Sequence, residues 1–172
     1  MIETTPDDLR AALGINRWVA DVQVASPFDS LESLMTTAHS AAIALTPDEI
    51  DEAISHHPRI GEKPRGEGVA QSFSRREQGT EQGAEGAAEQ SPEGGAHGDA
   101  VTTTAIAAGN AAYEAKFGRI FIIRAAGRSR AEILTELTRR LELDPAAEIT
   151  IVGEQLRDIA LLRLEALAGR TD

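Results

Sequence analysis

The sequence predicts an all-α protein, a single domain over residues 1–172 that forms a helical bundle of about seven to nine helices. Hydrophobic residues make up 41% of the chain but aromatic residues only 3%, so Ala, Leu, Ile and Val must build the core. Ala and Leu are strong helix formers. Most apolar residues recur at helical spacing, and the sequence contains no convincing pair of strands.

Start signals and apolar spacing predict the N-terminal helices. Thr5-Pro6 and Thr46-Pro47 each combine a capping residue with a proline at the first helical position, and acidic residues follow directly. Between these two starts the spacing predicts helices over residues 16–24 and 31–45. The helix after Pro47 should end near residue 56, because Pro58 disfavours helical dihedral angles in the residue before it.

The C-terminal part should be helical as well, after a long irregular region. Residues 57–72 are rich in Pro, Gly and charge and predict a loop, and Ser74 and Glu77 then form a capping-box pattern. Residues 79–100 have almost no apolar anchor, so we expect a flexible loop there. Apolar spacing then predicts helices over 102–117, over 129–143 and from Pro145 onward. The run Ile120 to Ile123 is too short to assign by periodicity and fits a buried extended segment.

Charge and composition exclude several functional classes. A net charge of −11 opposes binding to nucleic acid, which relies on Lys and Arg contacts to phosphates. The chain has no cysteine, no apolar run of the roughly 20 residues that a membrane span needs, and a polar, acidic start. We therefore expect a cytoplasmic protein without membrane contact. His56 and His57 are adjacent and point apart, so no metal site is predicted.

Two polar segments carry residues suited to catalysis. His57 lies at a predicted helix end beside Pro58, with Arg59 and Lys63 nearby, and histidine exchanges protons near neutral pH. The alternative is a helix end with two solvated histidines. In the second segment Ser74 would leave helix amides free for an anion, and Glu77 and Gln78 offer polar groups. The alternative there is an ordinary capping box.

Two later segments have a simpler structural explanation. Residues 110–129 read as a helix, a glycine stop and a buried apolar piece, which core packing explains. Residues 156–164 form an amphipathic helix whose arginines are more often surface residues.

The four segments together, in this order, resemble the OHCU decarboxylase family. The matching motifs are His-Pro-Arg-Ile-Gly at 57–61, Ser-x-x-Glu-Gln at 74–78, Asn-x-x-Tyr-x-x-Lys-Phe-Gly at 110–118, Phe-Ile-Ile at 121–123, Gly-Arg-Ser at 127–129 and Leu-Arg-Leu at 162–164. The resemblance spans residues 10–167. Two departures are the Gly- and Glu-rich stretch 79–99 and His56, where the family commonly has a small residue.

The resemblance implies an enzyme, a carboxy-lyase of uric acid degradation. Its substrate would be 2-oxo-4-hydroxy-4-carboxy-5-ureidoimidazoline (OHCU), its product (S)-allantoin, and it would use neither a metal nor an organic cofactor. It also implies a helical bundle that forms a homodimer. The residues that inherit a catalytic role are His57 as proton donor, Glu77 and Arg163. The substrate-binding residues would be Pro58, Ser74, Gln78, Phe121, Ile122, Ile123, Arg124, Ala125 and, as a second arginine, Arg157.

Two other functions stay open at this stage. One is a hydrolase or isomerase that acts on another ureide with the same scaffold. The other is a helical binding module without enzymatic activity, in which His57 is merely exposed. A cavity that held His57, Glu77 and an arginine together would argue against the binding module.

Overall fold

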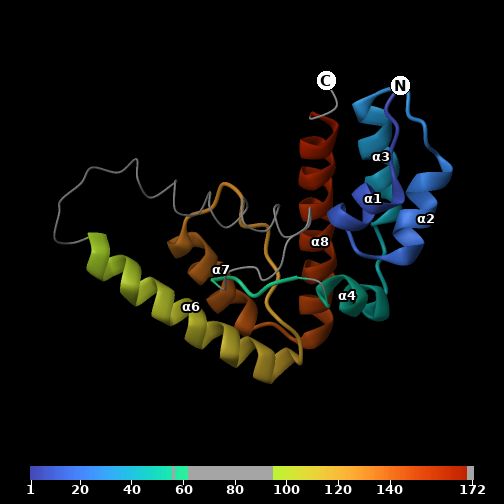
Figure 1. The fold of residues 1–172 in the computed structure, drawn as a ribbon. Coiled ribbons are helices and arrows are strands. Elements are labelled where there is room, and N and C mark those ends of the chain that lie inside the picture. Colours follow the sequence, from blue (N-terminus) through green and yellow to red (C-terminus); the bar gives the residue numbers. More distant parts are fainter. Residues whose placement is uncertain (56, 62–94, 170–172) are drawn as a thin grey trace. The chain divides into compact units, whose positions relative to one another are not determined.

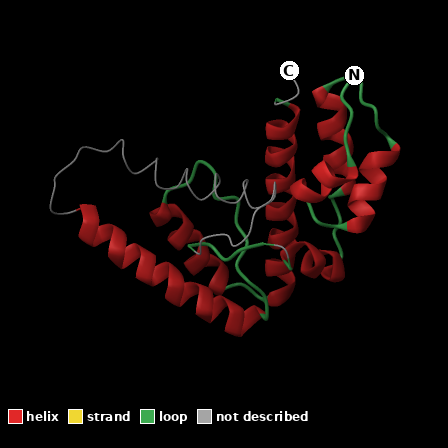
Figure 2. Cartoon of the chain, viewed as in Figure 1, coloured by secondary structure: helices red, strands yellow, loops and turns green. Residues whose placement is uncertain are grey.

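The computed structural model describes residues 1–55, 57–61 and 95–169. These residues form seven α-helices joined by loops, and their single extended pairing is an isolated bridge between Ile2 and Phe28 (Figure 2). The all-α prediction is therefore confirmed. No helix in this part of the chain is long and apolar enough to cross a bilayer.

The helices follow one another along the chain with the labels of Figure 1. They are α1 (Pro6–Ala12), α2 (Asn16–Val24), α3 (Leu31–Ala41), α4 (Pro47–Ile54), α6 (Gly95–Phe117), α7 (Arg130–Leu141) and α8 (Pro145–Ala168). The described residues group into two compact units, one of residues 1–57 and 149–169, the other of residues 58–61 and 95–148. The single-domain prediction stays a prediction.

In the first unit, side-chain caps start α1 and α3, and apolar faces join the helices. Thr5 and Ser30 accept hydrogen bonds from backbone N–H groups of the first turns of α1 and α3. α2 packs against both α1 and α3, and Trp18 on α2 is fully buried. The indole Nε1 of Trp18 donates to the Ala38 carbonyl of α3 at 2.9 Å, so one side chain both fills the core and joins two helices.

In the second unit, α6 packs along α7 over a core of buried side chains. Tyr113 lies at its centre, with ring centroids 4.6 Å from Phe117 and 5.2 Å from Phe121. The core residues are Ile106, Tyr113, Phe121, Ile123, Ala125, Ile133 and Leu137. The burial expected of this segment is confirmed, since residues 120–125 are neither helix nor strand and most of their side chains are buried.

α3 and α6 differ most from their predicted bounds, while α4 and α7 differ by one or two residues at an end. α3 ends at Ala41 and not at residue 45, because the Ala42 N–H turns back to the His39 carbonyl and Arg17 takes the Ala41 carbonyl. α6 begins at Gly95, so the flexible loop predicted for 79–100 is wrong for residues 95–100. An ion pair between Arg130 and Asp99 ties this first part of α6 to α7, a tertiary contact that composition does not reveal. Residues 79–94, and the helix start predicted at Ser74, lie outside the described residues.

Candidate active site

His57 follows directly after α4, as the sequence predicted. α4 starts at a capping box in which Thr46 and Glu49 each accept from the other's backbone N–H. The helix ends at Ile54, and the His57 backbone N–H donates to the Ile54 carbonyl at 2.9 Å, which closes the last turn. His57 and Pro58 are both half-buried. His57 is thus neither fully exposed nor part of the core, and its catalytic role stays a prediction.

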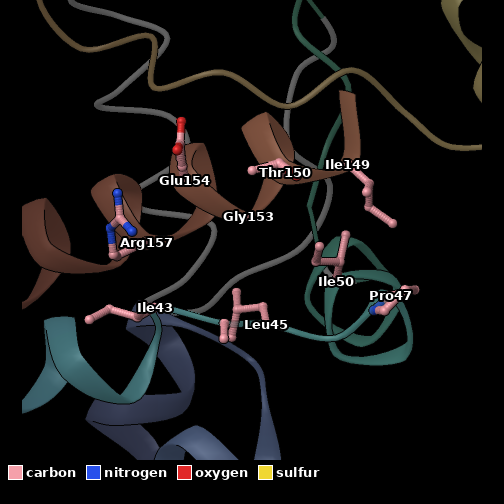
Figure 3. Close-up of a pocket in the computed structure, with 10 residues that line it drawn as sticks. Ile43, Leu45, Pro47, Ile50, Ile149, Thr150, Gly153, Glu154 and Arg157 are labelled. Atoms are coloured by element: carbon pink, nitrogen blue, oxygen red, sulfur yellow. The ribbon is translucent and has the colours of Figure 1, made fainter. Parts of the chain in front are cut away.

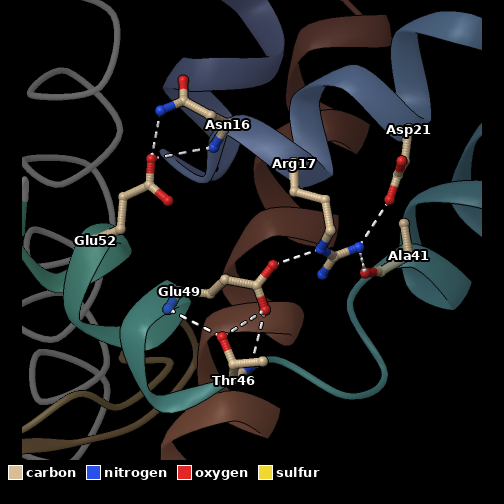
Figure 4. A network of polar contacts seen from close by, with 7 residues as sticks. All are labelled: Asn16, Arg17, Asp21, Ala41, Thr46, Glu49 and Glu52. Carbon is tan, nitrogen blue, oxygen red and sulfur yellow. Dashed lines mark hydrogen bonds and ion pairs between the residues drawn. The ribbon is translucent and has the colours of Figure 1, made fainter.

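A polar network fixes α4 against α2 (Figure 4). Arg17 pairs with Glu49, with Asp21 at 2.7 Å and with the Ala41 carbonyl at 3.1 Å. Asn16 donates to Glu52 of α4, with its side-chain Nδ2 2.6 Å from Oε1. The hydrogen bond from Arg17 holds the pKa of Glu49 below its ordinary value, so the carboxylate stays charged to a lower pH than a free glutamate does. The helix that precedes His57 is therefore anchored to α2 at two of its side chains.

The two arginines proposed from the last helix differ in their surroundings. Arg163 is 4% exposed, and its Nη1 donates to the Ala11 carbonyl of α1 at 3.4 Å. Arg157 is half-buried, and its nearest carboxylate oxygen belongs to Asp158, 3.9 Å from Nε. The Nε of Arg157 has no hydrogen-bond acceptor among the described residues.

Arg157 lines a pocket of about 200 Å³ in the first unit (Figure 3). The walls come from the loop between α3 and α4, the start of α4 and one face of α8. The pocket's lining surface is about equally polar and apolar. The polar side chains are those of Thr150, Glu154 and Arg157, and the apolar residues are Ile43, Ala44, Leu45, Pro47, Ile50 and Ile149. Neither His57 nor Arg163 lines this pocket.

The segment Phe121–Ala125 belongs to the second unit and is held from inside. The guanidinium of Arg140 donates to the Ile122 carbonyl at 2.7 Å and to both carboxylate oxygens of Glu148. Arg140 and Glu148 have no exposed surface. The Tyr113 hydroxyl donates to Glu148, and burial, followed by this hydrogen bond, raises the pKa of Tyr113. The phenol therefore stays neutral and keeps its proton for Glu148.

The predicted site residues are thus distributed over three parts of the chain. His57, Arg157 and Arg163 belong to the first unit, and Pro58 and Phe121–Ala125 belong to the second. Ser74, Glu77 and Gln78 lie outside the described residues. The meeting of His57 with Glu77 therefore stays a prediction. Among the described residues no group of three His, Asp or Glu side chains has the arrangement of a metal site.

The sequence analysis missed the buried pair Arg140 and Glu148. Its signal was present, because each residue falls on the apolar stripe of its helix. Arg140 lies three residues after the buried Leu137, and Glu148 lies four residues before the buried Val152. Two opposite charges on two apolar stripes are the pattern expected of a buried ion pair.

A family model and a curated relative both connect this chain with uric acid degradation or its decarboxylase. A family model described as OHCU decarboxylase matches residues 3–165. The uric acid degradation bifunctional protein TTL of Arabidopsis thaliana is 30% identical over 166 residues, which cover 96% of this chain and 48% of that protein. The chain thus spans about half the length of this curated relative.

Two solved structures are similar as well. A crystal structure of OHCU decarboxylase in the presence of (S)-allantoin is 26% identical with a TM-score of 0.71, over 95% of this chain and 98% of that one. An (S)-allantoin synthase, 14% identical with a TM-score of 0.61 over 94% of this chain and 48% of that one, shares the fold.

Proposed function

Because the chain belongs to the OHCU decarboxylase family, we propose that it removes CO2 from OHCU and releases (S)-allantoin. The observation that carries this proposal is the family match over residues 3–165. The OHCU decarboxylase that was crystallised in the presence of (S)-allantoin, similar along nearly its whole length, supports it.

The proposed reaction needs orientation, charge placement and one proton. The bond between the ring carbon and the carboxylate breaks, CO2 leaves, and the released electron pair forms a C=C bond to the neighbouring ring carbon while the former C=N pair moves to nitrogen. The acid then adds one proton to that neighbouring carbon. The hydroxyl on the first carbon becomes the carbonyl of allantoin as its proton passes to the ring nitrogen. Since the substrate itself accepts the electron pair, the residues have to position it and supply the proton.

We assign the proton transfer to His57. A half-buried imidazole at the end of an anchored helix has a restricted position, which suits proton delivery to one face of a flat intermediate and hence a single enantiomer. Glu77 is proposed to lie beside it, because a neighbouring carboxylate favours the imidazolium form. General acid catalysis of this kind contributes on the order of 10²–10⁴-fold.

We assign the binding of the anionic substrate to Arg163, with Arg157 as a second arginine. The burial of Arg163 supports this choice, because a charge away from water attracts a carboxylate more strongly than a solvated one. Ser74, Gln78 and Pro58 are proposed to contact the substrate. The apolar segment Phe121–Ala125 would keep water from the leaving carboxylate, a setting that favours loss of charge.

The test is turnover of freshly generated OHCU, followed by the circular dichroism of the allantoin formed. His57→Asn should lose about 10²-fold or more in kcat, the size of a lost acid catalyst, while it keeps the far-UV spectrum and melting temperature. His39→Asn is the matched control, because His39 is exposed on α3 and should have full activity when replaced. Full activity of His57→Asn contradicts the assignment of His57. Conversion of a different ureide in place of OHCU contradicts the proposed substrate.

Glu77→Gln separates a catalytic from a structural carboxylate. We expect a large loss of kcat with little change in melting temperature. A variant that mainly loses thermal stability would support the capping-box interpretation instead. We also propose a homodimer, for which light scattering should give twice the 18.3 kDa of one chain.

A further inference from the structure

The backbone of Phe121–Ala125 has no regular secondary structure to hold it, although its side chains at 121, 122, 123 and 125 are buried. A buried carbonyl without a donor costs free energy comparable to a lost hydrogen bond. At Ile122 the donor is a charged side chain, since Nη1 of Arg140 lies 2.7 Å from the carbonyl oxygen. One side chain of α7 therefore fixes the middle of this segment.

Arg140 is itself held rigidly. Its Nε lies 2.8 Å and 3.1 Å from the two carboxylate oxygens of Glu148, and its Nη2 also donates to Glu148. The guanidinium carbon lies 4.6 Å from the centroid of the Phe121 ring. Arg140 thus contacts both the backbone and an aromatic side chain of the segment, and Glu148 sets its orientation.

Stability alone does not explain this pair. Taking both charges out of water costs several kcal/mol per ion, and well-packed apolar residues often replace such pairs without loss of stability. An apolar side chain at position 140, however, has no N–H group for the Ile122 carbonyl. What Arg140 supplies, and a hydrophobic residue does not, is a fixed donor for one backbone oxygen.

We propose that Arg140 is a positioning residue that sets the course of Phe121–Ala125 through the Ile122 carbonyl and thereby the affinity for substrate. This inference rests on the proposed function, in which that segment lines the substrate site. Arg140 acts through the segment, and the inference requires no contact of Arg140 with the substrate.

The test compares two matched double variants. Each removes one ion pair that an arginine of α7 makes. R140M/E148Q removes the donor to Ile122 but leaves no unpaired charge, and the amide that replaces the Glu148 carboxylate still accepts from the Tyr113 hydroxyl. R139M/E136Q makes the same chemical change at the neighbouring ion pair, in which the Arg139 side chain is 51% exposed. Both variants are measured for melting temperature, for kcat and KM with OHCU, and for amide hydrogen exchange of residues 121–125.

We expect R140M/E148Q to fold with a lowered melting temperature, because the Ile122 carbonyl loses its donor. It should also exchange faster at 121–125 and raise KM about tenfold or more, with a smaller effect on kcat. A tenfold change in affinity corresponds to about 1.4 kcal/mol, which is the size of one lost hydrogen bond. R139M/E136Q should match the wild type in all three measurements. A purely structural role would lower the amount of active enzyme and leave KM unchanged.

Unchanged exchange at 121–125, or an unchanged KM alongside faster exchange, overturns the inference. If R140M/E148Q does not fold, R140K is measured instead. It should show the same faster exchange and higher KM, each to a smaller extent, because an ammonium lacks the fork of N–H groups that reaches Ile122 and Glu148 together. A wild-type protein that does not turn over OHCU contradicts the proposed function instead, and with it the claimed effect on affinity. Exchange would then still decide whether Arg140 holds the segment.

Discussion

Replacing Gly109 by alanine tests how closely α6 packs on α7. A Cβ added at Gly109 would lie 2.6 Å from Cδ2 and 3.1 Å from Cγ of Leu137. Carbon atoms in contact prefer about 3.5–4.0 Å, so Leu137 or the helix must move by about 1 Å. Leu137 has no exposed surface and contributes to the core of the second unit, so it has little room to move.

The expected size follows from two opposing terms. Alanine gains about 1 kcal/mol over glycine inside a helix. Overpacking of a well-filled core costs about 1–3 kcal/mol, and a contact this short belongs at the upper end. We therefore expect Gly109→Ala to lower the free energy of unfolding by about 2 kcal/mol, which lowers the melting temperature by about 4–8 °C in a chain of this length.

Gly153→Ala is the matched control within α8. There the nearest atom to an added Cβ is Cδ1 of Ile50 at 3.7 Å, an ordinary contact. The helix gain remains and the overpacking term is absent, so this variant should be more stable by about 1 kcal/mol. Urea unfolding of both variants measures the difference. If Gly109→Ala stabilises the protein as much as Gly153→Ala does, the close packing of α6 on α7 is wrong.

Two further predictions concern the first unit, which presents His57. Trp18→Phe removes the hydrogen bond to the Ala38 carbonyl, and the Ala42 N–H, the usual helical partner of that carbonyl, bonds to His39 instead. The free energy of unfolding, measured with urea, should therefore fall by about 1–3 kcal/mol. A fall of less than about 0.5 kcal/mol, the range of ordinary surface substitutions, contradicts the role of the indole. Arg17→Ala should lower the free energy of unfolding most near neutral pH. The hydrogen bond from Arg17 holds the pKa of Glu49 below its ordinary value. This stabilisation is therefore present above the unfolded-state pKa of Glu49 and is lost as the pH falls through its folded-state pKa. The free-energy difference between the wild type and Arg17→Ala, measured by urea unfolding from about pH 7 to pH 3, should shrink with falling pH, and a constant difference refutes the pairing.

Local signals in the sequence, which are capping residues, prolines and apolar spacing, located the starts of most described helices well. α2 has the predicted bounds, and Pro47 and Pro145 begin α4 and α8 as expected. The end of α3 was not predictable in this way. Its apolar spacing continues through Ala42, but Trp18 and Arg17 from another helix take carbonyl oxygens of its last turn. Such an end depends on tertiary contacts, which no window of sequence contains.

The candidate site also contains residues that local motifs identify and residues that tertiary contacts reveal. His57, Pro58 and the segment Phe121–Ala125 were proposed from motif order, and their roles stay predictions. The structure shows that His57 and Pro58 are half-buried and that most side chains of the segment are buried. Arg140 belongs to no motif that carried the resemblance and was therefore overlooked. It was nevertheless detectable by physical reasoning, because a buried stripe excludes an arginine unless a carboxylate and further acceptors lie on the facing elements.

The pair Arg140 and Glu148 shows why such residues call for a functional hypothesis. Each of the two helices would be equally amphipathic with an apolar residue at that position, so helix formation does not require the charges. The energetic cost of burying them is recovered only if every donor and acceptor is satisfied. In this protein one of those acceptors is a backbone oxygen of the segment that the family resemblance assigns to substrate binding. A charge in the core is then best understood as a means of fixing a loop, and its effect should be sought in the affinity for substrate before it is sought in the melting temperature.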